Sequence, residues 1–239
     1  MMESVVCLPS YAATGIARHG NHYYVSVGAA GGSIQVLDMD LNYVDSFERG
    51  DVRDVVSYKN GVIALAGTTD TPEEHGSVII GTAGDFDNAT VHTIEGFGSD
   101  YHRATIEVYE GTTALLGLSK AGWMAMDLRS APETVYSFPN PKCDDSHGGC
   151  PTNGVSTDGN LVFTANGGYG FRVFRPQTKG NFDALEVAGR YDVHNDPTFE
   201  WRKGGHSANH VEMKGRHLFV ASGSLGTFVY TITNRDTGS

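Results

Sequence analysis

Five segments of the sequence are rich in side chains that bind ligands, and they recur at similar intervals. They are 9–14, 49–54, 98–104, 143–153 and 202–210, which read PSYAAT, RGDVRD, GSDYHRA, CDDSHGGCPTN and RKGGHSANH. Each stands directly before a short alternating apolar run. Arginine, histidine and asparagine donate hydrogen bonds to anionic and polar ligands. The candidate binding residues are therefore Arg53, His102, Arg103, Asn153, His206 and Asn209.

Two arginines in these segments predict an anionic ligand. Arg53 and Arg103 coincide when residues 51–67 are aligned with 101–117. Guanidinium groups that converge repel each other unless an anion or nearby carboxylates lie between them. A small ligand that carries a carboxylate would fit, since guanidinium binds carboxylate through two parallel hydrogen bonds. The alternative is that both arginines form ion pairs with neighbouring aspartates and only tie the fold together.

The histidines and cysteines of the same segments offer a different chemistry, a metal site. Imidazole and thiolate are ligands of zinc and similar ions, and the set is His102, His147, Cys150, His206 and His210. A divalent metal would then be the cofactor of a metal-assisted hydrolase, lactonase-like or glycan-active. Cys143 and Cys150 fit a disulfide as well, which would remove Cys150 from a metal site.

Acidic residues offer a third chemistry. Glycoside hydrolysis needs two or three carboxyl groups at one site, one of them with a raised pKa. The candidates are Asp54, Asp100, Glu107, Asp144, Asp145 and Glu212. Acidic residues are common in a chain of net charge −11, and no Gly-x-Ser-x-Gly motif marks a nucleophile. No catalytic residue is assigned, and we expect a binding module rather than an enzyme.

An internal repeat predicts the elements that position these segments. Residues 148–175 align with 204–231 without a gap, and five pairs of glycines coincide. Weaker copies occupy 14–28, 51–67 and 101–117. The alternating strand that opens each copy starts near Ile16, Val55, Ile106, Val155 and Val211. These intervals are typical of four-stranded propeller blades.

The repeat predicts a closed all-β ring. Each copy divides into apolar strands at its glycine turns; the fifth copy lacks a fourth strand, and the apolar segment 4–9 precedes the first copy. We predict a single domain over 1–239, a five-bladed β-propeller of four-stranded blades closed by 4–9, which leaves no open edge. The blades are 13–48, 51–96, 101–139, 150–193 and 206–232. The main alternative is a β-sandwich, which would not place the missing strand of the last copy at the opposite end of the chain. A ring of six or seven blades would need a longer chain.

Two stretches of the repeat resemble a known family. Residues 159–175, GNLVFTANGGYGFRVFR, and 216–232, RHLFVASGSLGTFVYTI, are similar to the LVIVD-repeat β-propellers. This is a bacterial group with Ala-Asn-Gly-x-x-Gly between two apolar strands. The likeness is good in the last two copies and loose in the first three. It implies a secreted or surface-exposed protein, extracellular or periplasmic, and it brings no catalytic motif.

Composition narrows the function further. The 239 residues include 31 glycines and 28 acidic against 17 basic side chains, an acidic balance that disfavours nucleic acid as a partner. No apolar run approaches the ~18 residues of a membrane span. The first residues, MMESVVCLPSY, lack the features of a signal peptide, so the chain is cytosolic or a mature segment. We expect recognition of a small anionic, glycan or peptide ligand at the channel mouth.

Overall fold

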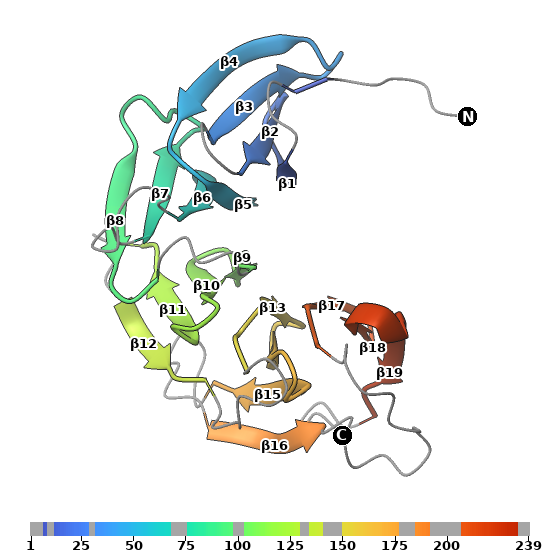
Figure 1. Ribbon diagram of the computed structural model, residues 1–239. Helices are drawn as coiled ribbons and strands as arrows, with labels where there is room; N and C mark the ends of the chain where they lie inside the picture. The colour runs from blue at the N-terminus through green and yellow to red at the C-terminus, as the bar shows by residue number, and fades with distance from the viewer. Residues whose placement is uncertain are drawn as a thin grey trace. The chain divides into compact units, whose positions relative to one another are not determined.

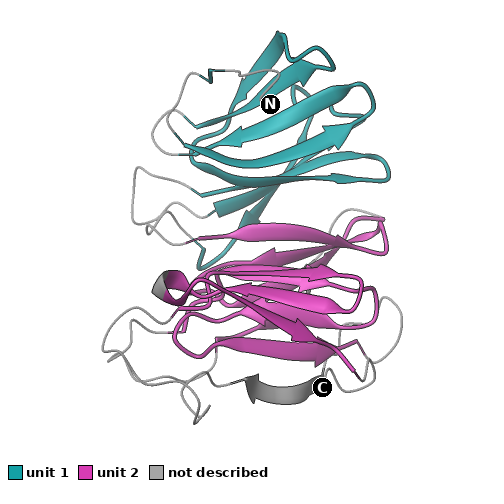
Figure 2. Cartoon of the chain, turned by 90° about the vertical axis from the view of Figure 1, so that its right-hand side faces the viewer, with its two compact units in different colours: residues 1–101 teal, residues 102–239 magenta. Residues whose placement is uncertain are grey.

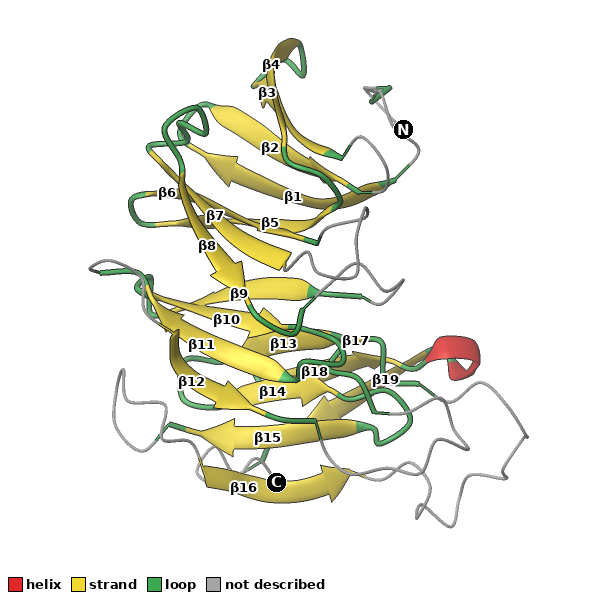
Figure 3. Cartoon of the chain, turned by 60° about the vertical axis from the view of Figure 1, so that its left-hand side comes forward, coloured by secondary structure: helices red, strands yellow, loops and turns green. Residues whose placement is uncertain are grey.

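The structure, a computed structural model, describes residues 7–8, 12–28, 32–67, 76–97, 103–129, 134–140, 150–176, 185–191 and 207–233. Regular structure within these residues is almost entirely β-strand, with one short 3-10 helix, Gly223–Leu225 (Figure 3). The chain divides into two compact units, Met1–Tyr101 and His102–Ser239 (Figure 2). No helix in the described part of the chain is long and apolar enough to cross a membrane.

Unit 1 contains two antiparallel sheets in which consecutive strands are neighbours (Figure 1). The first sheet consists of β1 Ala13–His19, β2 His22–Val27, β3 Ser33–Asp38 and β4 Tyr43–Glu48. The second consists of β5 Val52–Tyr58, β6 Gly61–Ala66, β7 Gly76–Thr82 and β8 Thr90–Ile94.

Unit 2 contains three sheets of the same kind. The third sheet consists of β9 Thr105–Tyr109, β10 Thr113–Gly117, β11 Trp123–Asp127 and β12 Thr134–Phe138. The fourth consists of β13 Gly154–Thr157, β14 Val162–Ala165, β15 Phe171–Arg175 and β16 Leu185–Tyr191. The fifth consists of β17 His210–Lys214, β18 His217–Ala221 and β19 Thr227–Thr231.

The sheets follow the five copies of the repeat in order, so the prediction of an all-β chain with one sheet for each copy is confirmed. The predicted closing strand at 4–9 lies outside the described residues except for Cys7 and Leu8, which belong to no strand. We call the first strand of each sheet its inner strand; these are β1, β5, β9, β13 and β17.

The second strands β6, β10 and β14 are buried along their whole length, which fits their continuous hydrophobic sequences. Every residue of β6 is buried, whereas β17 alternates between exposed and buried residues. A strand covered on both faces needs apolar residues throughout, while a strand covered on one face needs them only at every second position. The second strand β18 is an exception, since its residues alternate between exposed and buried although its sequence is apolar.

Aromatic side chains fill the space between sheets inside each unit. In unit 1, Phe86 is fully buried against Tyr24 and Phe47, with ring centroids 6.0 and 5.5 Å away. In unit 2, the buried ring of Trp123 in the third sheet contacts Phe174 of the fourth sheet, with centroids 4.9 Å apart and planes inclined by 58°. These contacts fix each sheet on the next within its unit.

One five-residue turn joins the second and third strands of every sheet in unit 2. Its copies are 118–122, 166–170 and 222–226. In each copy the first N–H bonds to the fifth carbonyl, at 2.8, 2.7 and 2.7 Å. The second residue has positive φ in each copy: Ser119 at 54°, Gly167 at 49° and Gly223 at 54°. The Ala-Asn-Gly-x-x-Gly motif therefore encodes this turn. Glycine suits its second position, which has positive φ, because glycine lacks a Cβ.

Polar side chains join neighbouring inner strands within each unit. Thr14 Oγ1 donates to the Val52 carbonyl at 2.8 Å in unit 1, and Asn153 Nδ2 donates to the Ala208 carbonyl at 3.1 Å in unit 2. In the opposite sense, Ser156 Oγ accepts the N–H of Met213 at 3.1 Å. An inner strand is an edge strand, so these bonds satisfy backbone groups that its own sheet leaves open.

Candidate functional site

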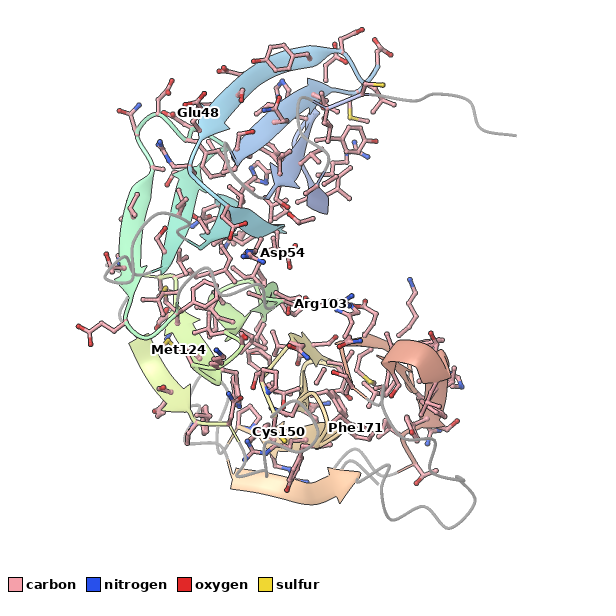
Figure 4. The ribbon with its side chains drawn as sticks, in the orientation of Figure 1. Glu48, Asp54, Arg103, Met124, Cys150 and Phe171 are labelled. Atoms are coloured by element: carbon pink, nitrogen blue, oxygen red, sulfur yellow. The ribbon has the colours of Figure 1, made fainter. Side chains whose placement is uncertain are left out.

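The predicted site residues lie at the starts of the inner strands. Arg53 is in β5 of unit 1, and Arg103 stands just before β9 in unit 2, where Figure 4 labels it. Asn153 and Asn209 directly precede β13 and β17. His102 and His206 lie outside the described residues. Three of the six candidates, Arg103, Asn153 and Asn209, therefore occupy matching ends of the three inner strands of unit 2.

Arg53 forms an ion pair with a neighbouring aspartate. Its Nε donates to Asp51 Oδ2 at 2.7 Å, and its terminal nitrogen also contacts that oxygen. The Asp51 side chain is 3% exposed; its Oδ1 lies close to Gly28, and its backbone lies close to Gly32. A buried carboxylate needs a partner of opposite charge, so the charge of Arg53 serves first to neutralise Asp51.

Arg53 and Arg103 do not occupy equivalent places, contrary to the sequence alignment. Residues 55–58 and 106–109 share one burial pattern, buried at both ends and half-buried between. Val55 pairs with Ala64 and Ile106 with Leu116, so Val55 matches Ile106. Asp54 then matches Thr105, and Arg53 is the extra residue of the register shift in β5. A register shift between Val52 and Asp54 and a longer turn after β9 account for the difference.

Arg103 is exposed and has no ion pair or hydrogen bond with any residue in the described part of the chain. Its charge acts on His210, the first residue of β17. Burial lowers the pKa of the His210 imidazole; the Glu212 carboxylate acts to raise that pKa, and Arg103 acts to lower it. His210 Nε2 lies 3.9 Å from Glu212 Oε2. Arg103, His210 and Glu212 thus form one electrostatic group in unit 2.

The two asparagines differ in their bonding. Asn153 is 5% exposed, and its amide is occupied by the Ala208 carbonyl. Asn209 is half-buried; its Oδ1 accepts the hydroxyl of Ser207 at 2.9 Å. The Asn209 Nδ2 has no partner among the residues that the structure describes. Asn153 therefore joins two sheets, and Asn209 keeps a donor available.

The two cysteines that the structure describes, Cys7 and Cys150, are not metal ligands in a cluster of described residues. Cys150 is buried and disulfide-bonded, with its partner outside the described residues, and Cys7 is free and exposed. Cys150 consequently has no thiolate for a metal. His102, His147 and His206 of the predicted ligand set lie outside the described residues. In the described ranges no three His, Cys, Asp or Glu side chains come together as a group that would hold a metal ion.

The candidate carboxylates are distributed over both units. Asp54 Oδ1 accepts its neighbour's N–H from Val55 at 2.9 Å and lies over Gly15, where a Cβ would overlap it. Glu107 Oε1 accepts the N–H of Val108 at 3.3 Å, while Glu212 is exposed beside His210. Asp100, Asp144 and Asp145 lie outside the described residues. Only Glu212 has a described link to the Arg103 and His210 group.

Sequence reasoning considered His210 and Glu212 separately, one as a metal ligand and one as a catalytic acid. They lie two residues apart in β17, so they project from the same face of the strand. That period of two was the signal that joins them. The influence of Arg103, more than a hundred residues earlier in the chain, had no local sequence signal.

The group has a defined chemical capacity. The Arg103 guanidinium and the Asn209 amide nitrogen are hydrogen-bond donors, and the His210 ring donates or accepts according to its tautomer. A donor set of this kind binds an oxygen anion, and arginine adds two parallel bonds to a carboxylate. Glu212 disfavours an anion in its immediate vicinity, so an anion would be favoured only on the Arg103 side of His210.

No family model matches the chain, and no curated protein matches it. Solved structures do. The hydrazine synthase of Kuenenia stuttgartiensis superposes with a TM-score of 0.60 and 12% identity, covering 90% of this chain and 69% of that one. The β-propeller domain of Myceliophteria thermophila Cps50 (Swd1) gives 0.61 and 13%, covering 92% and 70%. The N-terminal domain of Nup159 gives 0.55 and 11%, covering 90% and 54%. Together with the five antiparallel sheets of three or four strands, this likeness shows that the chain has a β-propeller fold.

Proposed function

We propose that the chain is a binding module that recognises a small anionic ligand, such as an acidic sugar or a peptide carboxylate, at the starts of the inner strands in unit 2. Arg103 carries the proposal. It is exposed and without a partner in the described part of the chain, whereas the charge of Arg53 is neutralised by Asp51. An uncompensated guanidinium beside other donors favours an anion.

The neighbouring residues support a carboxylate. His210 is 48% exposed and close enough to Arg103 for their charges to interact, so the two donors lie in one region of unit 2. Two parallel bonds from a guanidinium to a carboxylate are stronger than neutral hydrogen bonds and select a planar group. A neutral sugar of the same size would lose these bonds.

Calorimetric titration with glucuronate, acetate and neutral glucose tests this function. Glucuronate is expected to bind and glucose to bind more weakly, and Arg103→Gln is expected to weaken glucuronate about tenfold or more, since a charged hydrogen bond contributes about 1.5–3 kcal/mol. The matched control is Arg129→Gln in the same unit, where Arg129 is paired with Asp127. Equal losses in both variants, or no binding of any carboxylate, would contradict the proposal.

We also propose that the five sheets are the blades of one five-bladed domain, with residues 4–9 as the fourth strand of the last blade. The fifth sheet contains three strands in the described residues, and β19 is its last strand. An uncovered edge strand pairs readily with another strand. Deletion of residues 1–9 is expected to lower the unfolding midpoint, and deletion of 234–239 to leave it nearly unchanged; equal midpoints would exclude this closure.

For the location of the protein we propose the extracellular space, the periplasm or the cell surface, in line with the resemblance to LVIVD-repeat propellers. The disulfide at Cys150 supports this, because disulfides persist in oxidising compartments. Alkylating whole cells before lysis tests the proposal. Cys150 is expected to be protected while Cys7 is modified, and a fully alkylated Cys150 would place the protein in a reducing compartment.

A further inference from the structure

Unit 1 carries almost the whole net charge of the protein. Residues 1–101 contain 14 acidic and four basic side chains, whereas residues 102–239 contain 14 and 13. The formal charge is therefore −10 for unit 1 and −1 for unit 2. A field of this sign raises the local concentration of cations. Unit 1 thus favours a ligand of the opposite kind to the anion proposed for unit 2.

The first hairpin of unit 1 presents two imidazoles on one face. Strands β1 and β2 are joined by a two-residue turn, Gly20 and Asn21, and His19 pairs directly with His22 across it. Directly opposed residues project from the same face of a sheet, with Cβ atoms about 4.5–5.5 Å apart. Bonds between zinc and an imidazole nitrogen are about 2.0–2.1 Å long. One ring nitrogen of each histidine can therefore reach a common metal ion.

This histidine pair is a departure from the repeat. It closes the hairpin that every sheet forms between its first two strands. The closing pairs of the other four sheets are Tyr58 with Gly61, Tyr109 with Thr113, Thr157 with Val162, and Lys214 with His217. None of these pairs combines two side chains that commonly bind transition metals. The fold therefore does not require two histidines at this position.

A serine of the second sheet orients the ring of His19. The Nδ1 atom of His19 lies 3.2 Å from Ser57 Oγ in β5. In the tautomer in which Nδ1 donates to this hydroxyl, the lone pair is on Nε2. Histidine ligands are commonly held in this way, by a hydrogen bond from the ring nitrogen that does not bind the metal. Ser57 is thus a positioning residue, and Nε2 of His19 is the ligand atom.

His22 has a fixed ring and no basic neighbour on its face of the hairpin. Its half-buried ring packs edge-on against Tyr24, with centroids 6.4 Å apart and planes inclined by 72°. Neither of its ring nitrogens has a hydrogen-bond partner among the residues that the structure describes. Arg18 is the one basic side chain of β1 and β2, and it pairs with Tyr23. It therefore projects from the opposite face of the sheet.

A carboxylate on the next strand adds negative charge without being a ligand. His22 pairs with Asp38 of β3, so both side chains are on the same face. Asp38 Oδ1 accepts the N–H groups of Asp40 and Asn42, and Oδ2 accepts the Asn42 amide. Both carboxylate oxygens thus stabilise the turn after β3. The hairpin supplies two protein ligands rather than three, and water would complete the coordination of a metal ion.

We propose that His19 and His22 bind a divalent transition-metal ion such as Zn²⁺ at the turn of the β1–β2 hairpin, through Nε2 of His19 and a ring nitrogen of His22. Imidazole binds zinc, copper and nickel, whereas magnesium and calcium prefer oxygen ligands. Two protein ligands leave positions open on a four-coordinate ion, so the bound metal remains accessible to a further ligand. This site lies within unit 1 and does not rest on the anion binding proposed for unit 2.

Zinc titration of the full chain without an affinity tag tests the site. Every sample carries Cys7→Ser, because the exposed Cys7 thiol is itself a zinc ligand. Proton–nitrogen NMR spectra of the imidazoles report each histidine separately. We expect the His19 and His22 signals to move together with one midpoint in Zn²⁺ concentration, because one ion binds both rings.

Three variants identify the ligands. His22→Gln is expected to weaken zinc binding at His19 about tenfold or more, because the second imidazole of a chelating pair binds at high effective concentration. His217→Gln, at the corresponding turn of the fifth sheet, is the matched control and is expected to leave the midpoint unchanged. Ser57→Ala is expected to weaken zinc about tenfold, and Ser57→Thr, which keeps the hydroxyl, to restore the affinity.

Each of three results would overturn the site. An unchanged midpoint for His19 in the His22→Gln variant would mean an adventitious ion only, bound by single imidazoles. His19 and His22 signals that stay in place while other histidines respond would mean that zinc binds elsewhere. Different midpoints for the two signals would exclude a shared ion, and this comparison uses both native histidines, so it holds even if a variant fails to fold. Anion binding by Arg103 is measured separately, so the two proposals fail independently.

Discussion

The side-chain amide of Asn153 donates to the carbonyl of Ala208 at 3.1 Å and joins the inner strands of the fourth and fifth sheets. Thr14 makes the corresponding bond to the carbonyl of Val52 at 2.8 Å in unit 1. These bonds give a structural task to polar residues at the start of an inner strand. Arg103 differs from these residues: it is exposed at the start of its own strand and bonds to no residue in the described ranges.

Asn153→Ala is expected to lower the free energy of unfolding by about 1–3 kcal/mol, because it removes the bond and leaves a buried acceptor with fewer partners. Urea unfolding monitored by fluorescence measures the change. Asn160→Ala, on the exposed turn after β13, is the matched control and is expected to change stability by less than about 0.5 kcal/mol. Similar losses in the two variants would remove the structural role assigned to Asn153.

Ser119→Gly is expected to stabilise the protein by about 1 kcal/mol. Ser119 adopts φ 54°, a left-handed conformation that is unfavourable for residues with a Cβ. Its hydroxyl is buried and has no partner among the described residues, so glycine also removes an unsatisfied group. The thermal unfolding midpoint measures the effect. Ser137→Gly in β12 is the control and is expected to destabilise; a lower midpoint for Ser119→Gly would disprove this reading of the turn.

The strands and their glycine turns were predictable because alternation and turn residues are local signals. The turn at 118–122 has no clear sequence signal, because Ser119, Lys120 and Ala121 stand where the other copies carry glycine or different residues, although the backbone repeats the same bonds. Likewise, the apparent match of Arg53 with Arg103 ignored the shift between Val52 and Asp54. A bulge changes register without changing the pattern of residue types, so sequence spacing alone cannot reveal it.

The candidate site was less predictable than the fold. The choice of the inner-strand starts came from their enrichment in polar residues, but the pairing of Arg53 depended on burial of Asp51. The interaction of Arg103 with His210 depended on how β13 contacts both β9 and β17 within unit 2. Such long-range proximity is a product of tertiary packing and has no periodic signal in the sequence.

Protonation of His210 is expected to destabilise the folded protein. Burial and Arg103 lower the pKa of its imidazole in the folded state, so the unfolded chain takes up the proton first as pH falls below about 6.5. The free energy of unfolding is therefore expected to fall as the pH drops from about 6.5 to below the pKa of His210 in the folded state. Urea unfolding at pH 7.5 and 5.0 is expected to show a smaller loss in His210→Gln than in the wild type. His217→Gln, also in the fifth sheet, is the control; equal losses in wild type and His210→Gln would disprove the linkage.

The most direct test of ligand recognition is the NMR signal of the Arg103 Nε–Hε group during titration with glucuronate. We expect this signal to shift and saturate with glucuronate and to shift far less with glucose. The Arg129 signal, whose guanidinium is bound to Asp127, is expected to stay in place. Equal movement of the two arginine signals, or an unmoved Arg103 signal at saturating glucuronate, would contradict anion recognition at the start of β9.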